Sequence, residues 1–444
     1  MEVIQFEDKN LAHYSYSIIS NGEMAVIDPA RNPQPYYDLA KQYHAKISAV
    51  IETHPHADFV SSHLEIHNTT GAAIYVSRLL GAEYKHEYFD DGSVITLGKI
   101  TLSALNTPGH SPDSICIIAI DENGKQKAVF TGDTLFIGDC GRPDLRETAG
   151  ALTAKRETLA RQMYHSLRGE LMNLPDGVLV YPAHGAGSLC GKGMSDKNAS
   201  TMGIEKASNW CLQKMSEDDF VKTLLEDQSF VPKYFTYDVE LNKKGADNFS
   251  ESIRKVKISE QIPDQLKNYL VIDTRNESEF KKGFLKNSVN LMGDTKFETW
   301  LGSIIAPFER FYLLAKNKDQ LQPLIERIAK IGYEGQIELA FVASEIDGGK
   351  MKNLNIEHFK KFPDEFTVMD IRNPSEVKSR NIFEESLRIP LYELRERIGE
   401  IPTNKPIVVH CEGGYRSAAG ASIIKNLLKS DIDVFDLGEA IKTF

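Results

Sequence analysis

The chain of 444 residues is longer than one ordinary core requires, and the usual domain length of about 150 residues predicts two or three domains. Its 63 acidic and 52 basic residues give a net charge of −11, which argues against a nucleic-acid partner because such binding depends on Lys and Arg contacts to phosphates. The N-terminal residues lack the segments of a signal peptide and no apolar run is long enough to cross a bilayer, so we expect a cytoplasmic protein without membrane contact.

The first 235 residues alternate short apolar segments with longer amphipathic ones. Strands are expected where β-branched runs end at Pro, Gly or Asp, over residues 23–28, 46–51, 100–105, 114–120, 128–131 and 178–181. Helices are expected over residues 36–43 and 151–171. This pattern is typical of a mixed α/β domain, which we assign to residues 1–235.

Polar motifs follow these strands. The segment Thr-His-Pro-His-Ala-Asp-Phe at 53–59 is followed by Pro-Gly-His, Gly-Asp and Ala-His motifs, and the potential metal ligands in this series are His54, His56, Asp58, His110, Asp133 and His184. Imidazole and carboxylate groups suit zinc or iron. Because loops at the strand ends of one sheet can converge, we expect a metal site in this domain.

The order of these motifs resembles the metallo-β-lactamase superfamily over roughly residues 1–230 and implies an αββα sandwich. Dinuclear members usually continue the first motif with a histidine, whereas Phe59 stands here. A phenyl ring cannot ligate a metal, so a mononuclear site is expected. Within the superfamily that pattern is similar to the persulfide dioxygenases, whose iron takes two histidines and one aspartate.

This second resemblance implies a set of site residues. Fe(II), with zinc as the less favoured metal, would be held by His54, His110 and Asp133, and would leave positions for a persulfide and O₂. His56, Asp58 and His184 would then support the ligands or mark a vestigial second site.

Three more residues near these motifs are candidates for substrate binding. Arg142 either anchors an anionic group of the thiol carrier or forms a structural salt bridge with Asp144 or Asp139. Lys192, at the end of a glycine-rich segment, adds positive charge for an anionic carrier. Cys190 is either a redox-active thiol near the iron or an ordinary loop cysteine.

The second half of the chain contains an internal repeat. Residues 236–260 are rich in Lys, Asn, Asp, Glu and Ser, which is typical of a linker. Beyond them, residues 270–279 and 367–376 share the pattern Asp-x-Arg-Asn at an offset of 97 residues. We therefore expect two α/β copies, over residues 261–348 and 349–444.

The copies diverge at one loop. The second copy has Cys-Glu-Gly-Gly-Tyr-Arg-Ser at 411–417, between an apolar strand and a helix, and the first copy has no cysteine there. This loop resembles the active loop of a rhodanese, a sulfurtransferase, and is shorter than the related phosphatase loop. A cysteine at a helix N-terminus is favoured as thiolate, Gly413 and Gly414 let the loop curl, and Arg416 adds charge. The first copy resembles a rhodanese that has lost its cysteine.

Together these resemblances imply an enzyme that oxidises low-molecular-weight thiol persulfides, of glutathione, coenzyme A or a similar thiol, to sulfite. Cys411 would move sulfur between a persulfide, sulfite and thiosulfate, in sulfide oxidation or detoxification. Two alternatives stay open, a zinc thioester hydrolase similar to glyoxalase II and a non-enzymatic carrier or sensor of persulfides. A homo-oligomer is compatible with the sequence.

Overall fold

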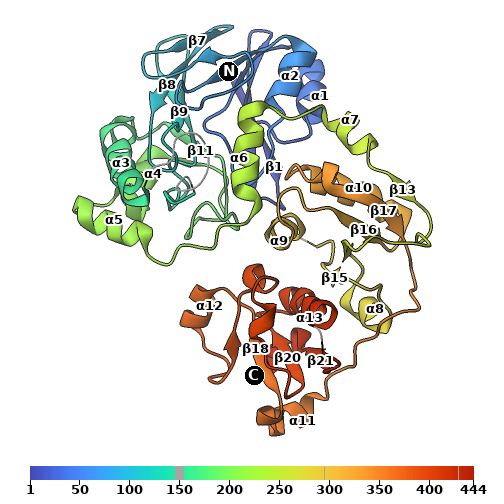
Figure 1. Cartoon of the computed structure of the whole chain (residues 1–444). Coiled ribbons are helices and arrows are strands. Elements are labelled where there is room, and N and C mark those ends of the chain that lie inside the picture. Colours follow the sequence, from blue (N-terminus) through green and yellow to red (C-terminus); the bar gives the residue numbers. More distant parts are fainter. Residues whose placement is uncertain (146–154, 295, 429) are drawn as a thin grey trace. The chain divides into compact units, whose positions relative to one another are not determined.

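The computed structural model describes residues 1–145, 155–294, 296–428 and 430–444, which divide into two compact units. The first unit comprises Met1–Glu251 with Ala329–Gly332, and the second comprises Ser252–Ile328 with Tyr333–Phe444. Figure 1 shows the course of the chain through its helices and strands. Among the described residues, no helix has both the length and the apolar character that a membrane span requires.

Two six-stranded sheets form the centre of the first unit. In spatial order, the first sheet contains β1 (Glu2–Asp8), β2 (His13–Ser20), β3 (Glu23–Ile27), β4 (Lys46–Ile51), β5 (Ala73–Val76) and β6 (Glu87–Tyr88). The second sheet contains β12 (Ser200–Thr201), β11 (Leu179–Pro182), β10 (Gln126–Gly132), β9 (Ile115–Ile120), β8 (Ile100–Asn106) and β7 (Val94–Leu97). Side chains of both sheets, including Ile27, Ile51, Leu102 and Phe130, form one buried cluster, so the sheets pack face to face.

Helices cover the outer faces of both sheets. The helices packed in hydrophobic clusters on these faces are α1 (Gln34–Gln42), α2 (His63–Thr70), α3 (Arg156–Gly169), α4 (Met202–Ser208) and α5 (Glu217–Leu225), and they are followed in the chain by α6 (Tyr234–Lys244) and α7 (Phe249–Arg254). Because side chains alternate along a strand, Met24 and Val26 of β3 pack in the cluster that contains Tyr36 of α1, while Ile27 faces the other sheet. Met163 of α3 packs in a cluster on the outer face of the second sheet. The predicted αββα sandwich is confirmed.

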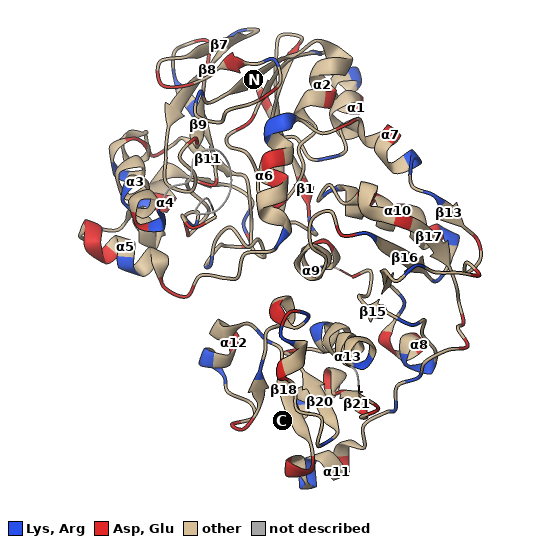
Figure 2. Cartoon of the chain, viewed as in Figure 1, with Lys and Arg blue, Asp and Glu red and all other residues tan. Residues whose placement is uncertain are grey.

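Local sequence signals explain individual helices, as in α5. The Ser216 side chain caps this helix by accepting a hydrogen bond from the backbone N–H of Asp219 at 3.1 Å. Acidic residues occupy the first turn, which Figure 2 shows in red, and Lys222 lies in the last turn. Charges in this order stabilise the helix because they oppose its macrodipole.

Strands lie at all six predicted positions, as β3, β4, β8, β9, β10 and β11, and the helix predicted over 36–43 is α1. The first residues of the helix predicted over 151–171 lie outside the described residues, and its remainder contains α3. The division between the two compact units, after Glu251, falls inside the segment 236–260 that was predicted as a linker, although this segment is largely helical. α6 and α7 lie there, and Asn242 and Lys243 are buried, so the polar composition reflects buried hydrogen bonds instead of solvent exposure.

The second unit contains two parallel sheets. The first has the spatial order β13 (Ile258–Ser259), β17 (Ile337–Val342), β16 (Phe311–Ala315), β14 (Leu270–Asp273) and β15 (Ser288–Asn290). The second has the order β19 (Leu387–Arg388), β18 (Thr367–Asp370), β20 (Ile407–His410) and β21 (Val434–Asp436). The helices are α8 (Glu277–Lys282), α9 (Phe297–Ile304), α10 (Lys318–Ala329), α11 (Ile356–Lys361), α12 (Pro374–Ser379) and α13 (Tyr415–Leu427).

Candidate functional site

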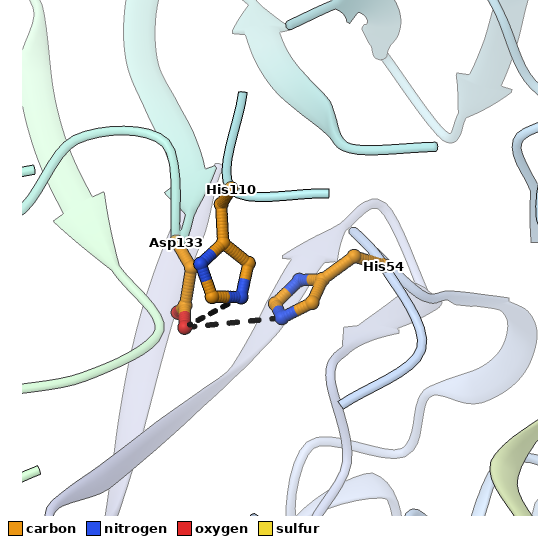
Figure 3. A group of neighbouring side chains, drawn as sticks. All are labelled: His54, His110 and Asp133. Carbon is orange, nitrogen blue, oxygen red and sulfur yellow. Dashed lines mark ion pairs between the residues drawn. The ribbon is translucent and has the colours of Figure 1, made fainter. Parts of the chain in front are cut away.

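Three side chains from loops at strand ends meet in the first unit. His54 follows β4, His110 follows β8, and Asp133 follows β10. The Nε2 atoms of His110 and His54 lie 3.5 Å and 3.8 Å from Oδ2 of Asp133. Figure 3 shows both imidazole rings with these nitrogens directed at the carboxylate. The structure thus brings together the three residues expected to bind the metal.

The geometry of these three side chains fits a metal ion. Within the described part of the chain, Oδ2 of Asp133 has no hydrogen-bond partner although it is buried. Ligand atoms about 2.0–2.2 Å from one ion lie roughly 3–3.5 Å apart, close to the separations seen here. Burial lowers the pKa of both His54 and His110, which favours the neutral imidazoles that metals bind. Two imidazoles and one carboxylate form the donor set typical of mononuclear non-haem iron.

Hydrogen bonds fix the orientation of both imidazole ligands. Nδ1 of His54 donates to Oγ1 of Thr53 at 2.9 Å, and that hydroxyl donates to Asp28 at 2.8 Å. Nδ1 of His110 donates to the backbone carbonyl of Arg142 at 2.8 Å. Because each Nδ1 carries the proton, each Nε2 is left as the lone-pair donor toward Asp133.

Arg142 contacts the protein itself through its guanidinium. Nε and Nη2 each lie 2.7 Å from an oxygen of Asp144, and Nη1 and Nη2 donate to carbonyls of Leu189, Ser229 and Phe230. These bonds occupy every nitrogen of the buried side chain. They do not support a contact with a substrate anion, and the structural salt bridge with Asp144 is the arrangement observed.

His56 lies outside the three-residue group because other partners hold its ring. Its Nε2 is 3.2 Å from Oδ1 of Asp28 and 3.7 Å from Oε2 of Glu52. Its backbone carbonyl accepts a hydrogen bond at 2.9 Å from the amide of Asn242, on α6. Because His56, Asp28 and Glu52 together form a further buried group that could hold a metal ion, the role of His56, in supporting the ligands or in a second site, stays a prediction.

A second cluster of potential ligands lies beside the first. Ligand atoms of Asp58, His184 and Cys190 lie within 4.8 Å of one another, and all three residues are buried. His184 bridges two carboxylates, since its Nδ1 is 2.7 Å from Asp133 and its Nε2 is 2.9 Å from Asp58. Phe59 packs against the ring of His56 with 4.4 Å between centroids. Cys190 thus lies beside Asp58 and His184, which were expected to support the metal ligands or to mark a vestigial second site.

Lys192 holds neighbouring backbone instead of projecting toward the metal ligands. Its Nζ donates to the carbonyl of Thr223 at 3.2 Å and also to that of Glu226, beside the end of α5. Its backbone N–H donates to Asp139 at 2.7 Å. These contacts connect the glycine-rich segment to α5 and do not support a role in binding an anionic carrier.

The cysteine loop of the second unit lies between β20 and α13. Cys411 is 1% exposed, and its Sγ accepts a hydrogen bond at 3.1 Å from the N–H of Gly414. Gly414 has a φ of 104°, and a Cβ there would lie 3.2 Å from the backbone of Glu439. A Cβ at Gly413 would meet no atom within 4 Å. Gly414 is therefore the glycine that the loop requires, and its N–H supports negative charge on the sulfur.

Two arginines of this copy are paired with carboxylates. Arg416 donates from both terminal nitrogens to Glu376 at 2.6 Å, and the Arg416 guanidinium lies 5.7 Å from the ring centre of Trp300. Arg372 donates to Asp370 and, from Nη1, to Glu412 at 3.1 Å. The positive charge expected from Arg416 is thus partly neutralised by Glu376.

The supporting residues Asp28, Asn242 and Glu376 were not identified from the sequence. Asp28 ends a predicted strand, and Glu376 lies in the repeated Asp-x-Arg-Asn segment, so both positions had a usable signal. Asn242 had none, because its partners are about 180 residues away in the chain.

Comparisons with known proteins agree with this organisation. A model of the metallo-β-lactamase superfamily matches residues 9–184, and a model of the rhodanese-like domain matches residues 355–440. The chain is 30% identical to a metallo-β-lactamase of Staphylococcus aureus with a known crystal structure, at a TM-score of 0.69 over 77% of this chain and 98% of that chain.

Two curated relatives match the first half of the chain. Cytoplasmic hydroxyacylglutathione hydrolase of Arabidopsis thaliana is 35% identical over 39% of this chain and 63% of that protein, so the match spans less than two thirds of its length. Mitochondrial persulfide dioxygenase ETHE1 of Bos taurus is 29% identical over 51% of this chain and 81% of that protein.

Proposed function

Because the chain belongs to the metallo-β-lactamase superfamily and carries a C-terminal rhodanese domain, we propose that it is a persulfide dioxygenase fused to a sulfurtransferase. The observation that carries the proposal is the buried group of His54, His110 and Asp133 in a chain that also contains the Cys411 loop. Likeness to persulfide dioxygenase ETHE1 supports the first activity.

The proposed oxidation converts RSSH, O₂ and H₂O into RSH, sulfite and two protons. The outer sulfur loses four electrons and O₂ gains them, so no further reductant is needed. Fe(II) held by the three residues would offer open coordination positions to the persulfide and O₂. Low-molecular-weight thiol persulfides, including those of glutathione and coenzyme A, are the proposed substrates.

The chain's own residues position and shield this site. Thr53 and the carbonyl of Arg142 hold the imidazoles of His54 and His110 in the orientation that directs Nε2 at the ion. Burial of all three ligand side chains limits the access of bulk water, which strengthens the electrostatic interactions inside the site. Asn242, on α6, donates hydrogen bonds to the backbone carbonyls of His56 and Phe59, in the loop that carries His54.

The proposed sulfur transfer takes place at Cys411 in two steps. Its thiolate attacks the outer sulfur of RSSH, the RS–S bond breaks, and RSH leaves with the proton of the persulfide. Sulfite then attacks the outer sulfur of the Cys411 persulfide, which releases thiosulfate and restores the thiolate. The N–H of Gly414 stabilises the negative sulfur in both states. The reverse direction uses the same bonds.

Sharing one polypeptide raises the local concentration of sulfite near the second activity. We assign the combined activities to sulfide oxidation or detoxification in the cytoplasm. A thiol carrier, O₂, sulfite and thiosulfate are then the small-molecule partners of the protein.

A second candidate function is a zinc thioester hydrolase. It is favoured by likeness to hydroxyacylglutathione hydrolase and by the cluster of Asp58, His184 and Cys190 beside the first metal site. Two zinc ions in these neighbouring sites would activate water for attack on a thioester. A carrier or sensor of persulfides without catalysis is the third candidate.

Metal analysis combined with an oxygen electrode separates these functions. The proposed function predicts one iron per chain and iron-dependent O₂ uptake on glutathione or coenzyme A persulfide. Stoichiometric zinc, hydrolysis of thioesters and no O₂ uptake would establish the hydrolase instead. Mass spectrometry after incubation with a sulfane donor tests Cys411, and the absence of an added sulfur atom would eliminate both the transferase and the carrier.

A further inference from the structure

The cysteine-free copy of the second unit retains the architecture of the active one. α10 begins at Lys318 and α13 at Tyr415, and the offset of 97 residues between them is the offset of the sequence repeat. The same offset relates the starts of β14 and β18, and of α8 and α12. Each residue of the Cys411 loop therefore has an identifiable counterpart in the first copy.

A cavity of about 500 Å³ occupies the position of the active loop in this first copy. Its lining includes Arg275 and Glu279, which follow β14, and Lys316 and Asp319, which follow β16. Ligands of parallel sheets bind at the C-terminal ends of strands, and pockets of this size hold small molecules up to about the size of a tripeptide. The cysteine-free copy therefore contains a cavity large enough for a small molecule.

Arg275 lines this cavity, and the hydrogen bonds of its side chain use Nε and Nη2. Its contacts with Asp273 repeat those of Arg372 with Asp370, including Nη2 to carboxylate distances of 2.6 Å and 2.7 Å. The copies differ at Nη1. In Arg372 this nitrogen donates to Glu412 of the cysteine loop, whereas the counterpart of Glu412 in the first copy is an alanine. Within the described residues, Nη1 of the buried Arg275 has no acceptor.

Asp319 is an exposed residue at the start of α10 and also lines this cavity. It is the counterpart of Arg416, so the charge at this position is inverted between the copies. The counterpart of Glu376 is Glu279, which pairs with Lys316 at 2.6 Å instead. In the part of the chain that the structure describes, Asp319 has neither an ion pair nor a hydrogen bond through its side chain. An isolated anion such as a persulfide is therefore disfavoured at the first turn of α10.

From this pair of unused groups we infer that the cysteine-free copy is a binding site for a small zwitterion of the amino-acid or peptide class. A carboxylate of the ligand would accept from Nη1 of Arg275, and its ammonium group would pair with Asp319. The other cations of the cavity, Lys316 and Arg327, already have carboxylate partners in Glu279 and Glu298. The site requires no thiol and holds the ligand without reacting with it.

Calorimetric titration of the full chain with the dipeptide alanylalanine tests this inference, because this zwitterion has one ammonium and one carboxylate and lacks both the thiol and the glutathione or coenzyme A portion of the proposed iron-site substrates. Saturable binding with one site per chain is expected. Acetylating the amine of the peptide, or esterifying its carboxylate, should each weaken binding by about ten- to hundredfold, the effect of losing one charged hydrogen bond. Absence of saturable binding up to about 10 mM, or equal binding of the acetylated peptide, overturns the inference.

Variants on the exposed start of α10 locate the site. Asp319→Asn should weaken binding by about tenfold or more, and Gln320→Trp should abolish it by filling the cavity. Glu326→Gln, on the same helix but outside the cavity lining, should bind as the wild type does. Unchanged binding by both Asp319→Asn and Gln320→Trp would place the ligand elsewhere and overturn the inference. O₂ uptake by these variants should equal that of the wild type, so the binding site and the dioxygenase can fail independently.

Discussion

Asn242 on α6 connects a helix far along the chain to the loop that carries the first metal ligand. Its amide nitrogen donates to the carbonyls of His56 at 2.9 Å and Phe59 at 2.8 Å, and its oxygen accepts from the N–H of Ser61 at 2.8 Å. All hydrogen-bonding groups of this buried side chain are used within one short segment. Asn242→Ala is therefore expected to release the loop that positions His54.

The expected loss of stability follows from these three bonds. The alanine variant leaves two buried carbonyls and one buried N–H without partners, at about 1–3 kcal/mol each. The better helix propensity of alanine returns roughly 0.5 kcal/mol, and relaxation of the loop reduces the sum. We expect the free energy of unfolding of the first unit to fall by about 3–5 kcal/mol, near the upper end for single substitutions. The affinity for the metal should fall by about 10- to 100-fold.

The distribution of tryptophans provides a selective assay. The chain has two, Trp210 in the first unit and Trp300 in the second, so the fluorescence of a Trp300→Phe protein reports on the unit that holds the metal ligands. With a urea dependence of about 3 kcal/mol/M, Asn242→Ala should lower the midpoint by roughly 1–1.7 M. Metal content after dialysis against a chelator of graded strength measures the affinity.

Two further variants test the reasoning. Asn242→Asp retains the acceptor for Ser61 but sets a carboxylate against two carbonyls, so it should destabilise at least as much as Asn242→Ala. Asn123→Ala, in an exposed turn, is the matched control and should leave both quantities unchanged. The reasoning is refuted if Asn242→Ala unfolds within about 0.2 M urea of the wild type and retains its metal equally well.

Three other predictions concern the two reactive regions. Cys411→Ala should gain no sulfur from a sulfane donor in mass spectrometry and should consume O₂ at the wild-type rate. Burial raises the pKa of Glu376, but the hydrogen bonds and the charge of Arg416 outweigh burial and hold this pKa below the ordinary 4.5. The stability that the Glu376–Arg416 pair contributes is therefore complete above pH 4.5. It is lost as the pH falls through the lower pKa of the folded state. The difference in Tm between wild type and Glu376→Gln should accordingly be constant from pH 8 to 5 and shrink at lower pH, and a difference that shrinks between pH 8 and 6 would contradict this sign. Cys190→Ala should retain one metal ion per chain by elemental analysis, whereas a fall from two ions to one would establish a dinuclear centre.

Much of the first unit could be predicted because its chemistry is local. Short apolar runs that end in polar motifs indicated the positions of six strands, and the proposed ligands His54, His110 and Asp133 each lie in the loop after one of them. Phe59 stands where dinuclear members of the superfamily usually have a histidine, and this difference is visible at one position of the sequence. Such features can be predicted from two general rules: apolar residues recur at regular spacing in strands, and loops at the strand ends of one sheet converge.

Contacts between distant segments could not be predicted in this way. The amide of Asn242 lies in a charged segment whose composition is typical of a linker, and only packing shows that it is buried. Arg142 has an aspartate two residues away and could serve either that partner or a ligand, and the structure shows its guanidinium paired with Asp144. The approach of Cys190 to Asp58 and His184 depends on the path of a glycine-rich loop, which no periodic pattern specifies.

The most direct test of the proposed function measures O₂ consumed and sulfite formed by the iron-loaded Cys411→Ala protein supplied with glutathione persulfide. The variant separates the oxidation from sulfur transfer, so no sulfite is converted to thiosulfate by the rhodanese loop. The account predicts one sulfite for each O₂ consumed, with both lost when His54 is replaced by alanine. Sulfite formation without O₂ consumption, or no reaction by the iron-loaded protein together with thioester hydrolysis by the zinc-loaded protein, would contradict it.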